Sequence, residues 1–95
     1  MLTLPIKRKW FDIILSGEKK EEYRAYNAYY RARFDKSIGR EMTCRFRNGY
    51  SRKSPTIECM VIPRYGYGRG EWGAEPNRKY IVLSVLSVKE VLADE

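Results

Sequence analysis

The 95-residue chain contains no histidine. This absence excludes catalytic triads and dyads that use an imidazole base, and it excludes zinc sites with histidine ligands. Cysteine is scarce as well, because Cys44 and Cys59 stand alone and outside the CxxC spacing of zinc and redox sites. The two could pair in a disulfide, but reduced thiols in a cytoplasmic protein are the default. We therefore expect no metal and no cofactor.

Long apolar runs are absent too. No stretch approaches the roughly 18 apolar residues of a transmembrane helix. The segment Met1–Lys9 carries its positive charges after its apolar residues, which is the reverse of a secretory signal. These features predict a cytoplasmic protein that makes no membrane contact.

Positive charge is what the chain has in excess. Nineteen Lys and Arg stand against twelve Asp and Glu, for a net charge of +7. Residues 1–53 hold fourteen basic and six acidic side chains, whereas residues 54–95 hold five and six. A one-sided positive field attracts polyanions such as nucleic acid, although it can also serve solubility alone. At this length we expect one domain over residues 1–95, present as a monomer.

Hydrophobic periodicity predicts an α+β chain. The elements expected are, in order, a strand over Leu2–Lys7, a helix over Lys9–Ser16, a helix over Ala25–Phe34, strands over Glu41–Arg47, Thr56–Ile62 and Tyr80–Val88, and a short helix over Lys89–Ala93. Pro5 favours an edge position for the first strand. Asn48-Gly49 is a hairpin signal, after which the partner strand begins at once or beyond the polar stretch Ser51–Ser54. Short strands with few helices indicate a small β-barrel or a strongly curled sheet, with helices at its ends.

The most informative segment follows the first helix. Gly17 is a plausible helix stop, and residues 18–24 then hold three cations and three anions. Such charge runs usually face water in weak ion pairs. On a regular strand Glu22 and Arg24 would share a face while Lys19 pointed away, so we predict a turn or bulge over residues 18–21 that brings the three together. A converged cluster could hold a phosphate or orient a base edge, or it could be an ion pair that pins the barrel without a ligand.

This region resembles the signature of the ASCH domain family, which is an apolar helix followed by G-x-K-x-x-E-x-R. The motif positions are occupied by Gly17, Lys19, Glu22 and Arg24. The Gly70–Gly73 loop and the Tyr80–Leu83 strand are also similar to ASCH proteins, so the resemblance covers essentially the whole chain. It implies a PUA-like β-barrel with a cleft beside the first helix, and a module that binds RNA.

The same family supplies an alternative function. One branch is an amidohydrolase that acts on an acylated cytidine, and another has ribonuclease activity. The amidohydrolase uses the motif Lys, a Thr at the motif Glu position and a later Glu; here Lys19 matches, Glu22 departs from Thr, and Glu71 is the candidate later acid. A small hydrolase acting on a modified nucleoside or RNA through these three residues is therefore the alternative to binding. A third hypothesis is an adaptor whose basic face docks an acidic protein.

Further candidate binding residues lie outside the motif. The stretch Tyr23–Phe34 alternates aromatic and basic residues, as single-strand binding surfaces do, and we expect Arg31 and Arg33 to lie on the surface. Tyr26 and Tyr30 are expected on the buried side of that helix.

Two more segments complete the set. Arg45 and Arg47 lie on the outer face of a predicted strand, where they could follow a phosphate backbone or protect a sheet edge. The Gly66–Gly73 loop lacks the Gly-Lys-Ser/Thr ending of a P-loop and is expected to be a mobile lip over the cleft, with Trp72 available to contact a base.

Overall fold

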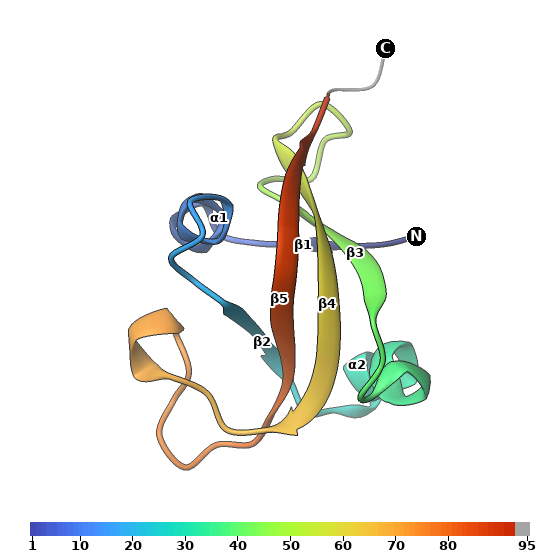
Figure 1. The fold of residues 1–95 in the computed structure, drawn as a ribbon, viewed down its shortest axis with the longest axis vertical. Helices are drawn as coiled ribbons and strands as arrows, with labels where there is room; N and C mark the ends of the chain where they lie inside the picture. The colour runs from blue at the N-terminus through green and yellow to red at the C-terminus, as the bar shows by residue number, and fades with distance from the viewer. Residues whose placement is uncertain (93–95) are drawn as a thin grey trace.

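Two long strands form the centre of the protein. The computed structural model describes residues 1–92, which fold into a five-stranded sheet with two α-helices and two 3-10 turns (Figure 1). The elements are β1 (Leu2–Pro5), α1 (Arg8–Leu15), β2 (Glu21–Ala25), α2 (Ala28–Phe34), η1 (Asp35–Ser37), β3 (Met42–Arg47), β4 (Thr56–Gly66), η2 (Gly70–Trp72) and β5 (Tyr80–Val91). The expected α+β class is confirmed. None of the helices within residues 1–92 has the length and apolar character needed to cross a membrane.

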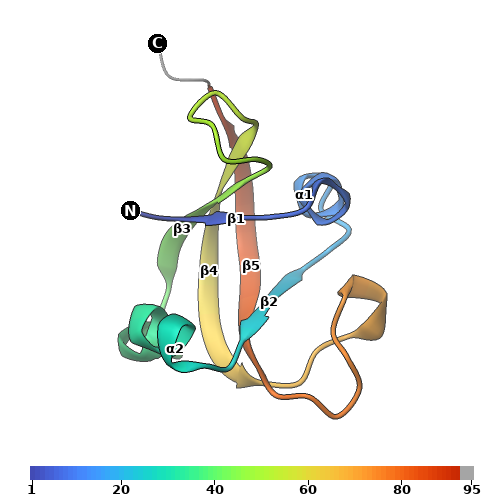
Figure 2. The same ribbon diagram turned by 180° about the vertical axis from the view of Figure 1, so that it is seen from behind.

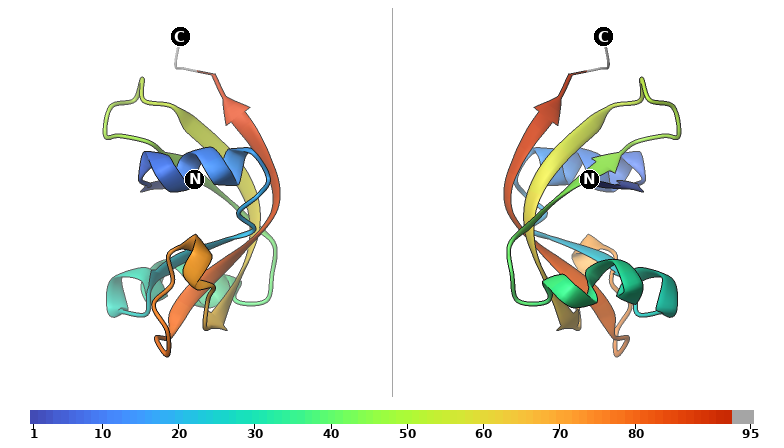
Figure 3. Two further views of the ribbon diagram at one scale, coloured as in Figure 1. Left: turned by 90° about the vertical axis from the view of Figure 1, so that its left-hand side faces the viewer. Right: turned by 90° about the vertical axis from the view of Figure 1, so that its right-hand side faces the viewer.

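The sheet is a curled half-barrel. Its strand order is β1-β3-β4-β5-β2, antiparallel throughout except for the parallel β1–β3 pair. A register shift at Met60/Val61 marks a bulge in the β4–β5 ladder, and bulges bend and twist the strand that carries them. Figure 3 shows the resulting curl, with both helices on the concave side. Figure 2 shows that the two edge strands, β1 and β2, both pass on this same side of β4 and β5.

Apolar side chains fill the concave face. The fully buried members include Ile14, Phe34, Phe46, Ile57, Ile81 and Leu83. Helix α1 contributes Phe11 and Ile14, which share a face because they lie three residues apart. Helix α2 contributes Phe34 and begins at the cap Asn27, whose side chain accepts a hydrogen bond from the Tyr30 N–H. Each short helix is therefore held by a few apolar contacts with the sheet.

Most of the expected elements are present, with shifted bounds. Pro5 does lie in an edge strand, and Gly17 ends the first helix with a positive φ of 86°. The hairpin partner begins beyond the polar stretch, because Arg47 pairs with Thr56. The expected terminal helix over Lys89–Ala93 is wrong for the described residues. Strand β5 continues to Val91, since residues 89–91 pair in register with residues 56–58 of β4 (Ala93 lies outside the described residues).

The second helix also differs from its expectation. It starts at Ala28 rather than Ala25, because Glu21–Ala25 is taken up by β2, which the charged sequence concealed. Tyr26 therefore precedes the helix and is 37% exposed, so its expected burial is wrong. Tyr30 is half-buried.

The two cysteines are opposite each other in the β3–β4 ladder. Cys44 pairs in register with Cys59, and both are free thiols with no exposed surface. Burial away from water raises the pKa of each thiol to about 12. They are core residues that stay protonated near neutral pH.

Candidate functional site

The candidate site lies at the seam where the half-barrel fails to close. Strands β1 and β2 are the two ends of the sheet order. Arg24 of β2 reaches across, and its Nη2 donates a 2.8 Å hydrogen bond to the Pro5 carbonyl of β1. A closed barrel would have backbone hydrogen bonds at this place. Here a side chain bridges the edges and leaves space beside it.

That space is a cleft of about 520 Å³. Its volume is within the range of small-ligand sites. The lining residues are Pro5–Lys7, Trp10, Glu22–Arg24 and Asn48–Tyr50. Both edge strands, helix α1 and the loop after β3 therefore contribute to one concave surface.

Glu22 provides a fixed carboxylate in the cleft wall. The residue is 5% exposed. Its Oε1 lies 3.1 Å from the Lys19 Nζ, and its Oε2 lies 2.8 Å from the Arg24 Nη2. Charge-assisted bonds to two cations fix this buried carboxylate in one orientation. The three motif residues thus converge, as the sequence predicted.

Lys19 takes part in this convergence because it lies outside the strand. After the turn at Gly17, the Lys19 N–H bonds the Ile13 carbonyl at 2.9 Å, and residues 18–20 form an irregular link before β2 begins. Strand alternation therefore does not apply to Lys19. Its side chain is 1% exposed, and its Nζ faces the Trp10 and Tyr23 rings at 4.2 and 5.3 Å. Desolvation lowers the Lys19 pKa, and the neighbouring Glu22 opposes that shift.

Arg24 connects the cleft to helix α2. Besides Pro5 and Glu22, it approaches the Tyr30 hydroxyl with its Nη1 at 3.5 Å. Its Nε is buried and has no hydrogen-bond partner among residues 1–92. Arg24 therefore lines the cleft with a guanidinium whose two terminal nitrogens already contact Pro5, Glu22 and Tyr30.

The glycine-rich loop Gly66–Gly73 packs against the buried side of the site, where Lys19 and Tyr23 lie. The Trp72 carbonyl accepts a hydrogen bond from the Lys19 Nζ, and the Arg69 N–H donates to the Tyr23 hydroxyl at 2.9 Å. Gly68 packs on the Tyr23 ring, which lies 2.3 Å from the place of a Cβ. This loop therefore covers Lys19, where the sequence suggested a mobile lip. The Trp72 ring stacks against Arg69 and is not part of the cleft lining.

The structure does not bring Glu71 into this cluster. Its side chain is 64% exposed, and its ion pair is with Arg69 at 3.9 Å. The candidate later acid is thus on the outer side of η2, whereas Lys19 is beneath the loop. Of the three candidate catalytic residues, only Lys19 and Glu22 are in contact.

The remaining candidate arginines occupy two other surfaces. Arg45 pairs with Glu58 at 3.1 Å, and Arg47 donates to the Thr56 hydroxyl at 3.4 Å, both on the sheet face opposite the core. The hydrogen bond from Arg45 is the main reason that the pKa of Glu58 lies below its usual range. Arg31 and Arg33 lie on α2. None of these four lines the cleft.

Several lining residues were not among the sequence candidates. Trp10 and Tyr23 supply aromatic walls, and Lys7 and Tyr50 lie at the exposed rim. The sequence held one usable signal, the basic run Lys7–Lys9 directly before Trp10. Tyr50 could not be found this way, because the loop after β3 reaches β1 only through the parallel pairing of the two strands, which places Pro5 opposite Arg47.

Within residues 1–92, no three potential ligands among cysteine, aspartate and glutamate cluster closely enough to hold a metal ion. Comparisons of the chain with protein-family models, curated proteins and solved structures found no match.

Proposed function

We propose that this protein binds RNA and seats one unpaired nucleotide in the seam cleft. The observation that carries the proposal is the cleft itself, an aromatic-walled space of about 520 Å³ with the Glu22 carboxylate and the Arg24 guanidinium fixed in its wall. Sequence-specific RNA recognition uses this combination, in which unstacked bases contact aromatic rings and hydrogen-bond along their edges.

The open edges of the sheet add to the recognition surface. An edge strand leaves alternate N–H and C=O groups unpaired on its outer side. Residues Glu22–Arg24 of β2 and Pro5 of β1 both line the cleft, so main-chain groups from two edges border it. These groups, together with the two charged side chains, offer both donors and acceptors to a base.

Charge supports a polyanion over a small neutral ligand. The exposed run Lys7–Lys9 lies at the cleft rim, next to the lining residue Trp10. The whole chain carries +7. A positive rim around an aromatic cleft attracts the phosphates on either side of a bound base.

The finer description of the fold is part of the same proposal. We assign the curled half-barrel to the PUA-like class and the chain to the ASCH family. The support is the convergence of Lys19, Glu22 and Arg24 after the Gly17 turn, beside a cleft next to the first helix.

Binding is better supported than hydrolysis. A catalytic Lys19 would need to reach substrate, but its side chain is buried, and its Nζ contacts Glu22, the Trp72 carbonyl and two rings. The pKa of Lys19 is lowered, which suits a nucleophile, yet Glu71 lies away from it. We therefore assign Lys19 a positioning role, in which it orients Glu22 and anchors the loop.

The test is fluorescence anisotropy with a labelled single-stranded RNA of about 12 nucleotides. Tyr50→Ala and Lys7→Gln alter the exposed rim without touching the core. We expect Tyr50→Ala to weaken binding roughly five- to a hundred-fold, the range for loss of one stacked base. Raising the salt concentration should weaken wild-type binding, and Lys7→Gln should reduce that salt dependence.

Matched controls are Tyr67→Ala and Lys36→Gln, which alter exposed residues outside the cleft lining. Both should bind like the wild type. Wild-type protein that does not bind RNA near physiological salt, or cleft variants that bind as well as the controls, would overturn the proposal.

A further inference from the structure

Helix α2 carries a second set of stacked rings and cations. Tyr29 is 55% exposed, and the Arg33 guanidinium lies 3.4 Å from the centre of its ring. Arg33 also donates to the Tyr29 carbonyl at 2.7 Å, which holds the guanidinium over the ring. The Tyr30 ring meets Tyr29 edge-on at 4.9 Å.

This set is continuous with the seam cleft. The Tyr30 hydroxyl is the group that Arg24 approaches at 3.5 Å, and the Arg24 guanidinium lies 5.9 Å from the Tyr30 ring centre. Arg24, Tyr30, Tyr29 and Arg33 therefore form one row, called here the α2 ladder. It leads from the cleft wall to the exposed side of the helix.

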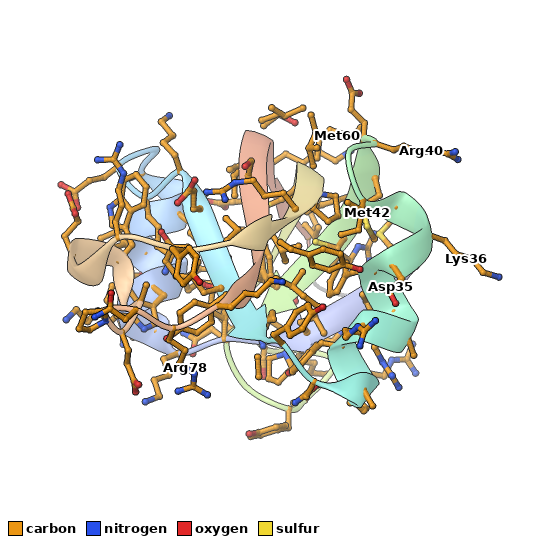
Figure 4. All side chains as sticks on the ribbon, turned by 90° about the horizontal axis from the view of Figure 1, so that it is seen from below. Asp35, Lys36, Arg40, Met42, Met60 and Arg78 are labelled. Carbon is orange, nitrogen blue, oxygen red and sulfur yellow. The ribbon has the colours of Figure 1, made fainter. Side chains whose placement is uncertain are left out.

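Arg24, at the cleft end of the ladder, is paired with Glu22, but the charge of Arg33 at the exposed end is not neutralised. Among residues 1–92, no carboxylate lies within 4.0 Å of the Arg33 side-chain nitrogens. Its neighbour Arg31 differs, because it pairs with Asp35 at 3.7 Å and stacks on Tyr26. Figure 4 shows the side chains of Lys36 and Arg40 pointing away from the sheet. Arg33 thus remains open to an anion.

We propose that the α2 ladder is the track for a single RNA strand whose adjoining nucleotide occupies the cleft. In this arrangement a second base stacks on Tyr29, and Arg33 holds the phosphate beside it. This inference rests on the proposed function and adds its substrate class, which is unpaired RNA longer than one nucleotide. A duplex does not fit the track, because its bases are already stacked on one another.

The experiment compares the ladder with the cleft in the same anisotropy assay. The variants Tyr29→Ala and Tyr29→Phe test the ring, and Arg33→Gln tests the charge. We expect Tyr29→Ala to weaken single-strand binding roughly five- to a hundred-fold, whereas Tyr29→Phe keeps most of the affinity because it keeps the ring. Arg33→Gln should reduce the salt dependence of binding by about one phosphate contact.

Tyr67→Ala and Lys36→Gln are again the controls, and circular dichroism confirms that each variant folds. The RNA probes are a uridine single strand, a mixed-sequence single strand and a fully paired hairpin stem. Losses in both Tyr29→Ala and Tyr50→Ala, with weak binding to the stem, support the inference.

Each other result decides against it. If only Tyr50→Ala loses affinity, the cleft binds RNA without the ladder, and the further inference alone fails. If only Tyr29→Ala loses affinity, the continuous track and the cleft proposal both fail. Equal binding of stem and single strands overturns the track, and absence of wild-type binding overturns both proposals.

Discussion

At the scale of single residues, the most consequential feature is a carboxylate buried between two cations. Lys19 and Glu22 have almost no exposed surface, so both charges have left water. Moving a charged group out of water costs free energy, and this cost is offset only when all of its oppositely charged and hydrogen-bonding partners are in place. The trio is therefore sensitive to the removal of any one charge, whatever ligand the cleft takes.

Glu22→Gln should lower the free energy of unfolding by about 3–5 kcal/mol, the cost of leaving a buried partner charge uncompensated. Urea denaturation followed by circular dichroism measures this change. The control is Glu71→Gln, which removes the same charge from an exposed position and should change stability by less than about 0.5 kcal/mol. Equal effects of the two substitutions would show that the trio does not stabilise the fold.

The convergence of Lys19, Glu22 and Arg24 could be predicted from the sequence because it depends on residues that are close together in the chain. A glycine stop followed by two more residues places Lys19 before the strand, and Glu22 and Arg24 then share a strand face. The same reasoning could not find Tyr50, and it assigned a role to Glu71 that requires a contact the fold does not make. Those outcomes depend on how distant segments pack.

At the scale of elements, the glycine-rich loop is held by close contacts. A Cβ on Gly68 would lie 2.3 Å from the Tyr23 ring and 2.8 Å from the Ala74 Cβ. The loop backbone can approach the site this closely only because the side chain is absent. Gly73, with φ of 99°, packs on Trp10 in the same way.

Gly68→Ala should therefore displace the loop and destabilise the protein by roughly 1–3 kcal/mol, the usual cost of overpacking. Amide hydrogen exchange over residues 66–79 should become faster. Gly70→Ala is the matched control, since nothing lies within 4 Å of its added Cβ. The interpretation fails if Gly70→Ala loosens the loop as much as Gly68→Ala does.

Helices and strands were harder to predict from the sequence where charged residues interrupt the hydrophobic periodicity. Strand β2 consists of Glu-Glu-Tyr-Arg-Ala, which has no apolar alternation, and it forms because β5 offers a long partner. The end of β5 was expected to be helical, yet Thr56 through Met60 hold it as a strand. In both cases tertiary pairing overrides the local preference.

At the scale of the whole molecule, the buried titratable groups set the response to alkaline pH. The pKa of Cys44 and of Cys59 is raised to about 12, and the pKa of Tyr23 is raised by burial. Each group keeps its proton in the folded state after the unfolded state has lost it. Their contribution is thus fully present below the ordinary pKa of each group and falls as pH rises above it.

We expect the free energy of unfolding to decline above about pH 9, by up to about 1.4 kcal/mol per pH unit for each thiol. Lys19 acts in the opposite sense, because its pKa is lowered and the folded state releases its proton first. Below pH 10.5, the ordinary pKa of a lysine, the contribution of Lys19 therefore offsets part of the decline in the free energy of unfolding. Urea titrations at a series of pH values test this, and Cys59→Ala should flatten the slope. A slope unchanged by that substitution would contradict the assignment to the thiols.

The strand order also fixes when the site can exist during synthesis. In the sheet β2 is bonded only to β5, through Tyr80–Ser84, although about 55 residues separate the two strands in the chain. Until those residues leave the ribosome, Glu22 and Arg24 belong to a strand without a partner. The two cleft residues are therefore translated early but placed late, so a nascent chain stalled before residue 80 has the motif and cannot yet form the cleft.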